Sequence, residues 1–243
     1  MGQIGIAPPS RMRADSPTGV RSRVLTIHDR LVRSFGPQRD WWPAEDPFEI
    51  LLGAVLVQHT RWALVAQVLA RLQRETHLDP DRLLRVRLPL LETWLRPAGC
   101  QRQKARRIRA MARWYREQGF EQLSRLSTAA LRERLLAQEG IGPESADAIL
   151  LYAFRRRVWV IDRSALRLYS RLGLCQDHPA DFRLRILPHL PPSIAWRQEH
   201  HALVVLHGQR FCSAQPRCTG CSLIRGCDWA RRAISTGRVP NPR

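Results

Sequence analysis

The sequence predicts an all-α protein, and three observations support this prediction. Apolar residues recur at the three- and four-residue intervals of an amphipathic helix along nearly the whole chain. No internal repeat and no β-rich region interrupts that pattern. Apolar residues make up 44% and charged residues 25% of the 243 residues, which are the proportions of an ordinary globular chain. We therefore expect helices that pack around a hydrophobic core.

The first half of the chain is expected to begin with a tail and to continue as helices. Residues 1–20 are rich in Pro, Gly, Ser and Arg and predict a flexible basic tail. A first helix follows this tail and ends at Gly36 and Pro37, both of which stop helices. A loop over residues 38–46 comes next. Six further helices are predicted over residues 47–57, 60–74, 79–86, 88–96, 101–118 and 128–138.

The second half contains a turn with two glycines and a cysteine-rich end. Gly140 and Gly142 separate one predicted helix from the next, which begins at Pro143. Asp162 follows a short extended stretch, at the position expected for the N-cap of another helix. The last predicted segment, residues 211–229, is a loop. The predicted helices of this half cover residues 143–154, 163–172, 179–187 and 193–210.

The charge of the chain indicates a polyanionic partner. Lys plus Arg is 40 against 21 for Asp plus Glu, which gives a net charge of +19. Such an excess binds polyanions through the release of condensed counterions. A membrane surface is the competing partner, but the sequence has no lipidation site and no basic helix with bulky apolar residues. The apolar runs around Gly53 are too short to cross a bilayer, and the first residues contain no hydrophobic signal segment. We therefore expect a cytoplasmic protein that binds nucleic acid.

Four cysteines near the C-terminus have the spacing of a metal site. They follow the pattern C-x5-C-x2-C-x5-C, at Cys212, Cys218, Cys221 and Cys227. Four thiolates suit either zinc or a [4Fe–4S] cluster. Zinc ribbons usually present two C-x2-C pairs, whereas only Cys218 and Cys221 have that spacing here. The pattern therefore favours the iron–sulfur cluster, with zinc as the alternative.

The turn at Gly140 and Gly142 has the features of a phosphate-binding helix start. Glycine lets a ligand approach the backbone closely, and Pro143 suits the first position of the following helix. The free N–H groups at that helix start can bind phosphate oxygens. In a strongly basic chain this arrangement predicts a helix-hairpin-helix. A plain tight turn between two helices is the alternative.

Lys104 is the only lysine in the sequence, because every other basic residue counted in the net charge is an arginine. Arginine keeps its proton and does not form imines. Any mechanism that needs a Schiff base must therefore use Lys104 or the N-terminal amine.

The hairpin, the Asp that follows its second helix, and the four-cysteine loop together resemble the endonuclease III superfamily of DNA glycosylases. The resemblance extends from Val24 to Trp229, and the segment 200–208 is similar to the family's approach to its cluster. The first cysteine spacing is one residue shorter than the family's usual six. The resemblance implies a monomer that binds double-stranded DNA in a groove between two helical lobes.

The resemblance also implies where each lobe lies in the sequence. A six-helix barrel lobe with the helix-hairpin-helix corresponds to residues 45–158. A second lobe, built from N- and C-terminal helices and carrying the [4Fe–4S] loop, corresponds to residues 21–44 and 159–243. In the family the hairpin grips the DNA backbone, often through a monovalent cation held by its carbonyl groups.

Further motifs are similar to the 3-methyladenine DNA glycosylase III branch of that superfamily. They are Trp41-Trp42-Pro43 with residues 47–60, Arg96-Pro97-Ala98-Gly99 with Gln103-Lys104-Ala105, and the hairpin with Glu144-Ser145-Ala146. In that branch the flipped purine stacks between aromatic side chains. The likeness implies a base pocket that contains Trp42, Pro43, Trp62 and the carboxylate of Glu144. It also implies that Asp162 is the catalytic carboxylate, while N-capping is its structural alternative.

The same likeness implies the DNA contacts. Gln58, His59 and Cys100 are candidates to fill the gap that the flipped base leaves, although the branch has Asn where this chain has His59. The predicted contacts to the DNA backbone are Gly140, Ile141, Gly142 and Ser145.

Two departures from the wider superfamily restrict the reaction. The lyase members carry their Schiff-base lysine in the second helix of the hairpin, where this chain has Glu144. The adenine-excising members use a glutamate where this chain has Ala54. We therefore expect a monofunctional, nucleoid-associated glycosylase for damaged, alkylated bases. The alternatives are a glycosylase for oxidised pyrimidines with weak or lost lyase activity, and a DNA-binding homologue without catalysis.

Overall fold

A computed structural model describes residues 17–44, 46–176 and 178–236. Within these residues the chain is helical and contains no β-strand, which confirms the predicted all-α class. Residues 1–16 of the predicted tail lie outside the described residues. The first helix, α1 (Pro17–Phe35), begins before the predicted end of that tail. Val20 is only 1% exposed, because it continues the helical spacing of the buried Val24, Ile27 and Leu31.

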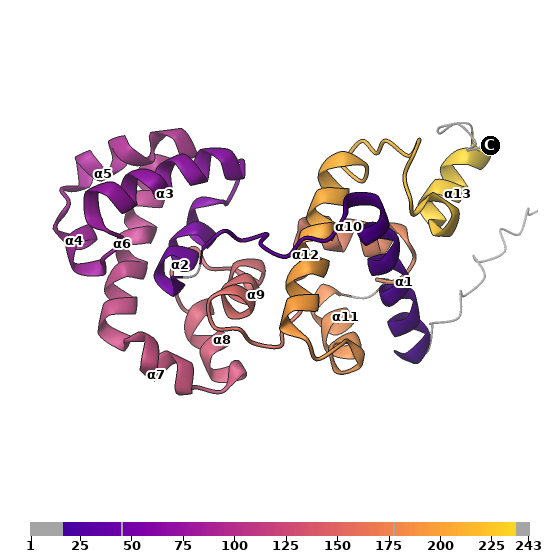
Figure 1. The fold of residues 1–243 in the computed structure, drawn as a ribbon, viewed down its shortest axis with the longest axis horizontal. Helices are drawn as coiled ribbons and strands as arrows, with labels where there is room; N and C mark the ends of the chain where they lie inside the picture. Colours follow the sequence, from indigo (N-terminus) through magenta and orange to yellow (C-terminus); the bar gives the residue numbers. More distant parts are fainter. Residues whose placement is uncertain (1–16, 45, 177, 237–243) are drawn as a thin grey trace, which may run out of the picture.

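The helices pack around two separate hydrophobic cores, which Figure 1 shows as two lobes. The first core lies on the left of Figure 1. Its helices are α2 (Pro47–Leu56), α3 (Trp62–Thr76), α4 (Pro80–Arg85), α5 (Leu88–Leu95), α6 (Gln101–Gln118), α7 (Phe120–Arg125), α8 (Thr128–Leu136) and α9 (Pro143–Tyr152). The second core is formed by α1, α10 (Arg163–Arg171), α11 (Pro179–Ile186) and α12 (Ile194–Arg210). Helix α13 (Asp228–Ser235) packs against α10.

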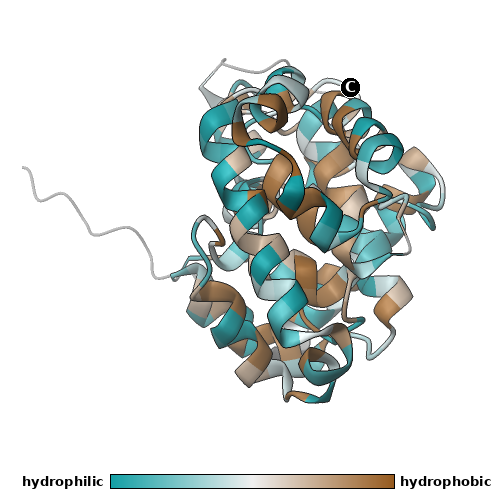
Figure 2. Cartoon of the chain, turned by 90° about the vertical axis from the view of Figure 1, so that its left-hand side faces the viewer, coloured by the Kyte–Doolittle hydropathy of each residue, from teal (hydrophilic) through white to brown (hydrophobic). Residues whose placement is uncertain are grey.

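Helix α2 is the centre of the first lobe because it is apolar nearly all round. All of its residues from Phe48 to Leu56 except Glu49 are buried, and the helix packs against α3, α6 and α9. Asp46 caps its start by accepting a hydrogen bond from the Glu49 amide at 2.8 Å. Most other helices are amphipathic, and Figure 2 shows hydrophobic and hydrophilic residues side by side along single helices. No helix among the described residues is both long and apolar enough to span a membrane.

Lys104 is buried in this lobe and is 3% exposed. Its Nζ donates hydrogen bonds to the carbonyl oxygens of Leu56 and Ala98, each at 2.8 Å. Burial lowers the pKa of this amine. The hydrogen bonds to the two carbonyl groups replace bonds that the amine would make to water. The lysine therefore joins the end of α2 to the short 3-10 turn η1 (Arg96–Ala98).

Two helices differ from the predicted elements. The six residues of α7 are not predicted, because Gly119 stops α6 and the remaining apolar residues are too few for a helical pattern. Helix α13 occupies residues at and beyond the predicted end of the cysteine-rich loop. The remaining short elements are the 3-10 turns η2 (Leu187–His189) and η3 (Ile224–Gly226).

Candidate active site

A cleft with a volume of about 1320 Å³ lies between the two cores. Residues of the first lobe form one side, and the start of α10 and the side of α12 form the other. Pro43 and Cys100 are exposed and do not line it. The predicted site residues that line the cleft are Trp42, Gln58, His59, Trp62, Gly140, Ile141, Gly142, Glu144, Ser145 and Asp162.

Asp162 is the N-cap of α10 and also faces the cleft. Its Oδ1 accepts a hydrogen bond from the amide of Ala165 at 2.7 Å. Its Oδ2 lies 4.0 Å from Nε2 of His201, and 22% of the Asp162 side chain is exposed. The structural role and the open position are therefore compatible, because they use different oxygen atoms of one carboxylate.

His201 and Tyr152 lie beside Asp162, and the sequence analysis assigned neither of them to the site. His201 lines the cleft from α12, and its Nδ1 lies 2.8 Å from the hydroxyl of Tyr152. Burial lowers the pKa of His201, while the charge of Asp162 acts in the opposite direction. The available signal was the spacing of His201, Val205 and Gln209, which places these cleft-lining residues on one face of a helix.

The indole rings of Trp42 and Trp62 line the cleft, and the ring of Tyr152 packs against Trp42. The ring of Trp42 lies 5.2 Å from that of Trp62, edge to face, and 5.1 Å from that of Tyr152. Gly53 makes this packing possible, because a Cβ at that position would lie 3.1 Å from Cζ2 of Trp42. Nε1 of Trp42 is buried and has no hydrogen-bond partner among the described residues. Trp42 and Trp62 therefore give the cleft an apolar ring surface.

Glu144 lies in the first turn of α9 and lines the same cleft. Burial raises the pKa of its carboxyl group, and the negative charge of Asp162 raises it further. The positive charge of Arg163 acts in the opposite direction. Two carboxyl groups thus face one cleft, and the environment of Glu144 favours its protonated form relative to that of an ordinary glutamate.

The hairpin is held in place by Gln58. Its Nε2 donates to the carbonyl oxygen of Gly140 at 2.8 Å and to the Ser145 hydroxyl at 3.2 Å, and its Oε1 accepts from Arg107 at 3.0 Å. Gln58 and Ser145 were predicted to contact DNA, and in this structure their side chains bond to each other. Arg107 was not predicted, although it lies on α6 and lines the cleft.

His59 and Cys100 are both exposed and have left-handed backbone conformations, with φ angles of 58° and 46°. His59 lies beside the hairpin at the cleft, whereas Cys100 starts α6 away from it. The structure therefore brings His59 into the candidate site but does not bring Cys100 there. Left-handed backbone is rare in residues other than glycine.

Cys212, Cys218, Cys221 and Cys227 line one small cavity of about 20 Å³ next to α10. Among the described residues, no three His, Cys, Asp or Glu side chains come close enough together to hold a metal ion as they stand. Nη1 of Arg171 donates to Sγ of Cys212 at 3.2 Å. Burial, together with the three other thiols, raises the pKa of Cys221 to about 11, while a hydrogen bond with the backbone of Leu223 acts in the opposite direction. Bound metal ions would offset the repulsion among such thiolates, so this donor set fits a metal or a cluster.

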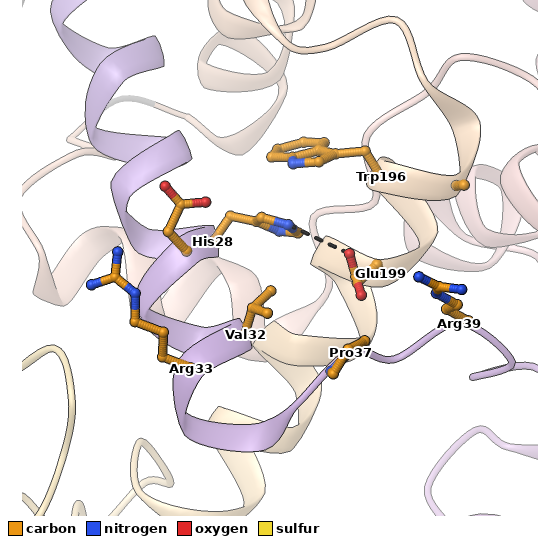
Figure 3. Close-up of a pocket in the computed structure, with 9 residues that line it drawn as sticks. His28, Val32, Arg33, Pro37, Arg39, Trp196 and Glu199 are labelled. Carbon is orange, nitrogen blue, oxygen red and sulfur yellow. Dashed lines mark ion pairs between the residues drawn. The ribbon is translucent and has the colours of Figure 1, made fainter.

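A second cavity, of about 610 Å³, lies on another face of α12 (Figure 3). None of the predicted site residues lines it. Figure 3 shows the ion pair between His28 and Glu199, in which Nε2 and Oε2 are 3.5 Å apart. The other carboxylate oxygen of Glu199 accepts from the amide of Gln38 at 3.0 Å. This pair therefore fixes the segment that leads from α1 to Trp42.

The hairpin geometry predicts that Gly140 tolerates a side chain less well than Gly142 does. Gly140 has a φ angle of +81°, and a Cβ there would overlap the Arg107 side chain. A Cβ at Gly142 would meet no atom within 4 Å, and its φ is −89°. We expect Gly140→Ala to lower the free energy of unfolding by at least about 1 kcal/mol. Gly142→Ala is the matched control and should lose less stability, because no atom obstructs its Cβ and only the weaker N-cap preference of alanine acts there. Urea denaturation of both variants measures this, and equal stabilities would contradict the assignment.

The sequence matches the family model of the HhH-GPD superfamily base excision DNA repair proteins over residues 52–187. A protein of Methanocaldococcus jannaschii named as a DNA repair glycosylase is 32% identical over 210 residues, which cover 84% of this chain and 95% of the relative. The fold is similar to that of endonuclease III in a non-covalent complex with DNA, with a TM-score of 0.73, 24% identity, and coverage of 88% of this chain and 98% of that one.

A second solved structure has a similar fold. It is the 3-methyladenine DNA glycosylase of H. pylori bound to 1,N6-ethenoadenine, with a TM-score of 0.64 and 24% identity over 80% of this chain and 98% of that one. The family model covers more than half of this chain, and the M. jannaschii relative matches over nearly its whole length. The chain therefore belongs to the HhH-GPD superfamily of base excision DNA repair proteins.

Proposed function

We propose that the chain is a monofunctional DNA glycosylase that removes a damaged, alkylated base with Asp162 and without a Schiff base. The observation that carries this proposal is the placement of the only lysine. Lys104 is buried, its Nζ is bonded to two carbonyl groups, and it does not line the cleft. A carboxylate, in contrast, faces the cleft beside the hairpin.

The proposed reaction breaks the bond between the sugar and the base. Such bonds break through an oxocarbenium-like sugar with positive charge near C1′. Oδ2 of Asp162 is free of the capping bond and can stabilise that charge. An alkylated purine carries a positive charge and leaves as a neutral base, so no strong acid is required. This chemistry fits a site that offers a fixed carboxylate and no free lysine.

The indole rings in the cleft support a cationic base as the substrate. An electron-poor base stacks favourably on indole rings, by about 0.5–2 kcal/mol per contact. Trp62 is partly exposed and lines the cleft, while Trp42 is covered on one side by Tyr152. We therefore propose that Trp62 and the open side of Trp42 bind the flipped base and that Glu144 contacts its polar edge. Pro43 is exposed and does not line the cleft, so it is not part of this proposal.

Double-stranded DNA is proposed to lie across the hairpin. The amide groups at the start of α9 are available to phosphate oxygens, and a chain with a net charge of +19 attracts the backbone. Gln58 donates a hydrogen bond to the carbonyl of Gly140, so we propose that it stabilises the hairpin. His59 is then the more exposed candidate for the gap that the flipped base leaves. The carbonyl of Gly140 accepts one hydrogen bond from Gln58, and its second lone pair is available to a monovalent cation at the hairpin.

The four cysteines are proposed to hold a [4Fe–4S] cluster. When bound, the cluster would supply a cross-link that keeps the loop folded against α10. Arg167 and Arg171 already join this loop to α10, through the carbonyl oxygens of Cys212 and Ser213. Because α10 begins at Asp162, the loop would support the helix whose start carries the proposed catalytic group.

The first prediction from this proposal concerns Asp162. Asp162→Asn keeps an N-cap side chain but removes the negative charge. We expect base release to fall by at least about 10²-fold while binding of lesion-containing DNA is retained. Single-turnover base release followed by alkaline cleavage of the abasic site measures the loss. Borohydride should trap no covalent complex with the parent chain, and efficient trapping would contradict the monofunctional assignment.

The second prediction concerns the substrate. Duplexes that carry 3-methyladenine, thymine glycol or a G·T mismatch should be compared, and 3-methyladenine should be released fastest. Trp62→Ala should slow that release about tenfold, because one stacking contact is lost. Trp114→Ala removes an indole outside the cleft and is the matched control. Faster release of thymine glycol would favour the oxidised-pyrimidine alternative, and no release from any duplex would favour a DNA-binding protein without catalysis.

The third prediction concerns the cluster. The parent chain should contain about four iron ions and four acid-labile sulfides. Cys221→Ala should lose them, because it removes one thiolate of the proposed set. Cys175→Ala should retain them, since Cys175 is buried in the second core and does not line the cavity that the four other thiols share. Metal and sulfide analysis of the purified proteins measures this. Zinc without sulfide in the parent chain would support the zinc alternative instead.

A further inference from the structure

His201 faces Asp162 at a distance that suits a shared water molecule. The two residues lie on α12 and at the start of α10, and the two helices pack against each other. Nε2 of His201 and Oδ2 of Asp162 are 4.0 Å apart. This distance is too long for a direct hydrogen bond and short enough for one water molecule to contact both atoms. Both side chains line the cleft, so a sugar bound there would face them.

Tyr152 determines which nitrogen of His201 carries the proton. The Tyr152 hydroxyl lies 3.2 Å from the carbonyl oxygen of Gln198 and 2.8 Å from Nδ1 of His201. The hydroxyl has one proton, which can be donated to either acceptor. With that proton donated to Gln198, Nδ1 of His201 carries a proton of its own and donates to the tyrosine oxygen. In the neutral imidazole this leaves Nε2 as an acceptor, directed towards Asp162.

We propose that His201 binds the attacking water together with Asp162, and that Tyr152 positions His201 for this role. The inference rests on the proposed function, because it requires Asp162 to be the catalytic carboxylate. Oδ2 of Asp162 accepts one hydrogen of the water and Nε2 of His201 accepts the other. These two bonds direct a lone pair of the water oxygen into the cleft, where C1′ of the sugar would lie.

The reaction then balances without another reactant. The bond between C1′ and the base nitrogen breaks, and its electron pair leaves with the cationic base, which becomes neutral. The water oxygen forms a bond to C1′, and the proton that it loses passes to Asp162 and then to solvent. His201 stays neutral throughout and takes no proton. Its contribution is the orientation of the nucleophile, which is distinct from the charge stabilisation that Asp162 supplies.

The test is a competition between two nucleophiles. Base release from 3-methyladenine DNA is measured under single-turnover conditions in water containing methanol, and the products at C1′ are separated into the free sugar and the methyl glycoside. His201→Leu should slow base release by about 10²-fold. It should also raise the methyl glycoside fraction, because water is no longer held in preference to methanol. Affinity for DNA that contains an abasic-site analogue should stay unchanged.

Three further variants separate positioning from packing. His201→Gln should restore part of the rate, because its amide oxygen can still accept a hydrogen bond from water. Tyr152→Phe should lower the rate of base release less than His201→Leu does. It removes the hydrogen bond that fixes the tautomer of His201 but keeps the imidazole. His189→Leu makes the same change at an exposed site outside the cleft and should behave like the parent.

The outcomes distinguish this inference from the function on which it rests. If His201→Leu leaves the product ratio unchanged, or lowers rate and DNA affinity together, His201 only packs in the cleft and the inference is wrong. If the parent chain releases the base and Asp162→Asn does so equally well, the proposed function fails, whatever His201 does. If Asp162→Asn no longer releases the base while His201→Leu gives the same product ratio as the parent, the proposed function is supported and the inference about His201 is wrong.

Discussion

The N-cap hydrogen bond of Asp162 is the interaction on which the site depends. Capping bonds of this kind contribute about 1 kcal/mol to stability, but here the bond also fixes the direction of the carboxylate. One oxygen is held by the Ala165 amide, so the second can only face the cleft and His201. The formation of α10 therefore also places the Asp162 carboxylate between the lobes. The structural and catalytic interpretations of this residue do not compete.

Helix α12 connects this charge to the rest of the molecule, because its successive residues face different surroundings. His200 is fully buried in the second lobe, where its Nε2 bonds to the Tyr169 hydroxyl and its ring stacks on Trp196. His201, about 100° further round the helix, faces the cleft. The same helix thus anchors the second core and forms one side of the site. Tyr152 completes the connection, because it contacts both His201 and the ring of Trp42.

Much of the fold and the site could be predicted from the sequence, because local signals determine them. Helix starts at Asp46 and Asp162 have caps that a short sequence window shows. The hairpin glycines and the grouping of four cysteines are equally local. Trp62 and Glu144 line the cleft, and their assignment to a base pocket came from the family likeness.

The features of the site that the sequence did not predict depend on contacts between distant segments. Nothing in its local sequence shows that Gln58 braces Gly140, which is 82 residues away. Tyr152 and His201 are 49 residues apart and meet only when the two lobes pack. Cys100 was predicted to help fill the gap that the flipped base leaves, and it lies outside the cleft at the start of α6. Arg107 was one arginine among many, and only its contact with Gln58 distinguishes it.

The burial of Lys104 has a consequence for how this protein can be regulated and handled. No other side chain of the sequence carries a primary amine, and this one is 3% exposed. Acetylation of lysine, which lowers the charge of many DNA-binding surfaces, therefore has no accessible side chain to modify. The positive surface consists of guanidinium groups, which keep their charge at any physiological pH. Amine-reactive labels would consequently attach to the folded chain at its N-terminus alone.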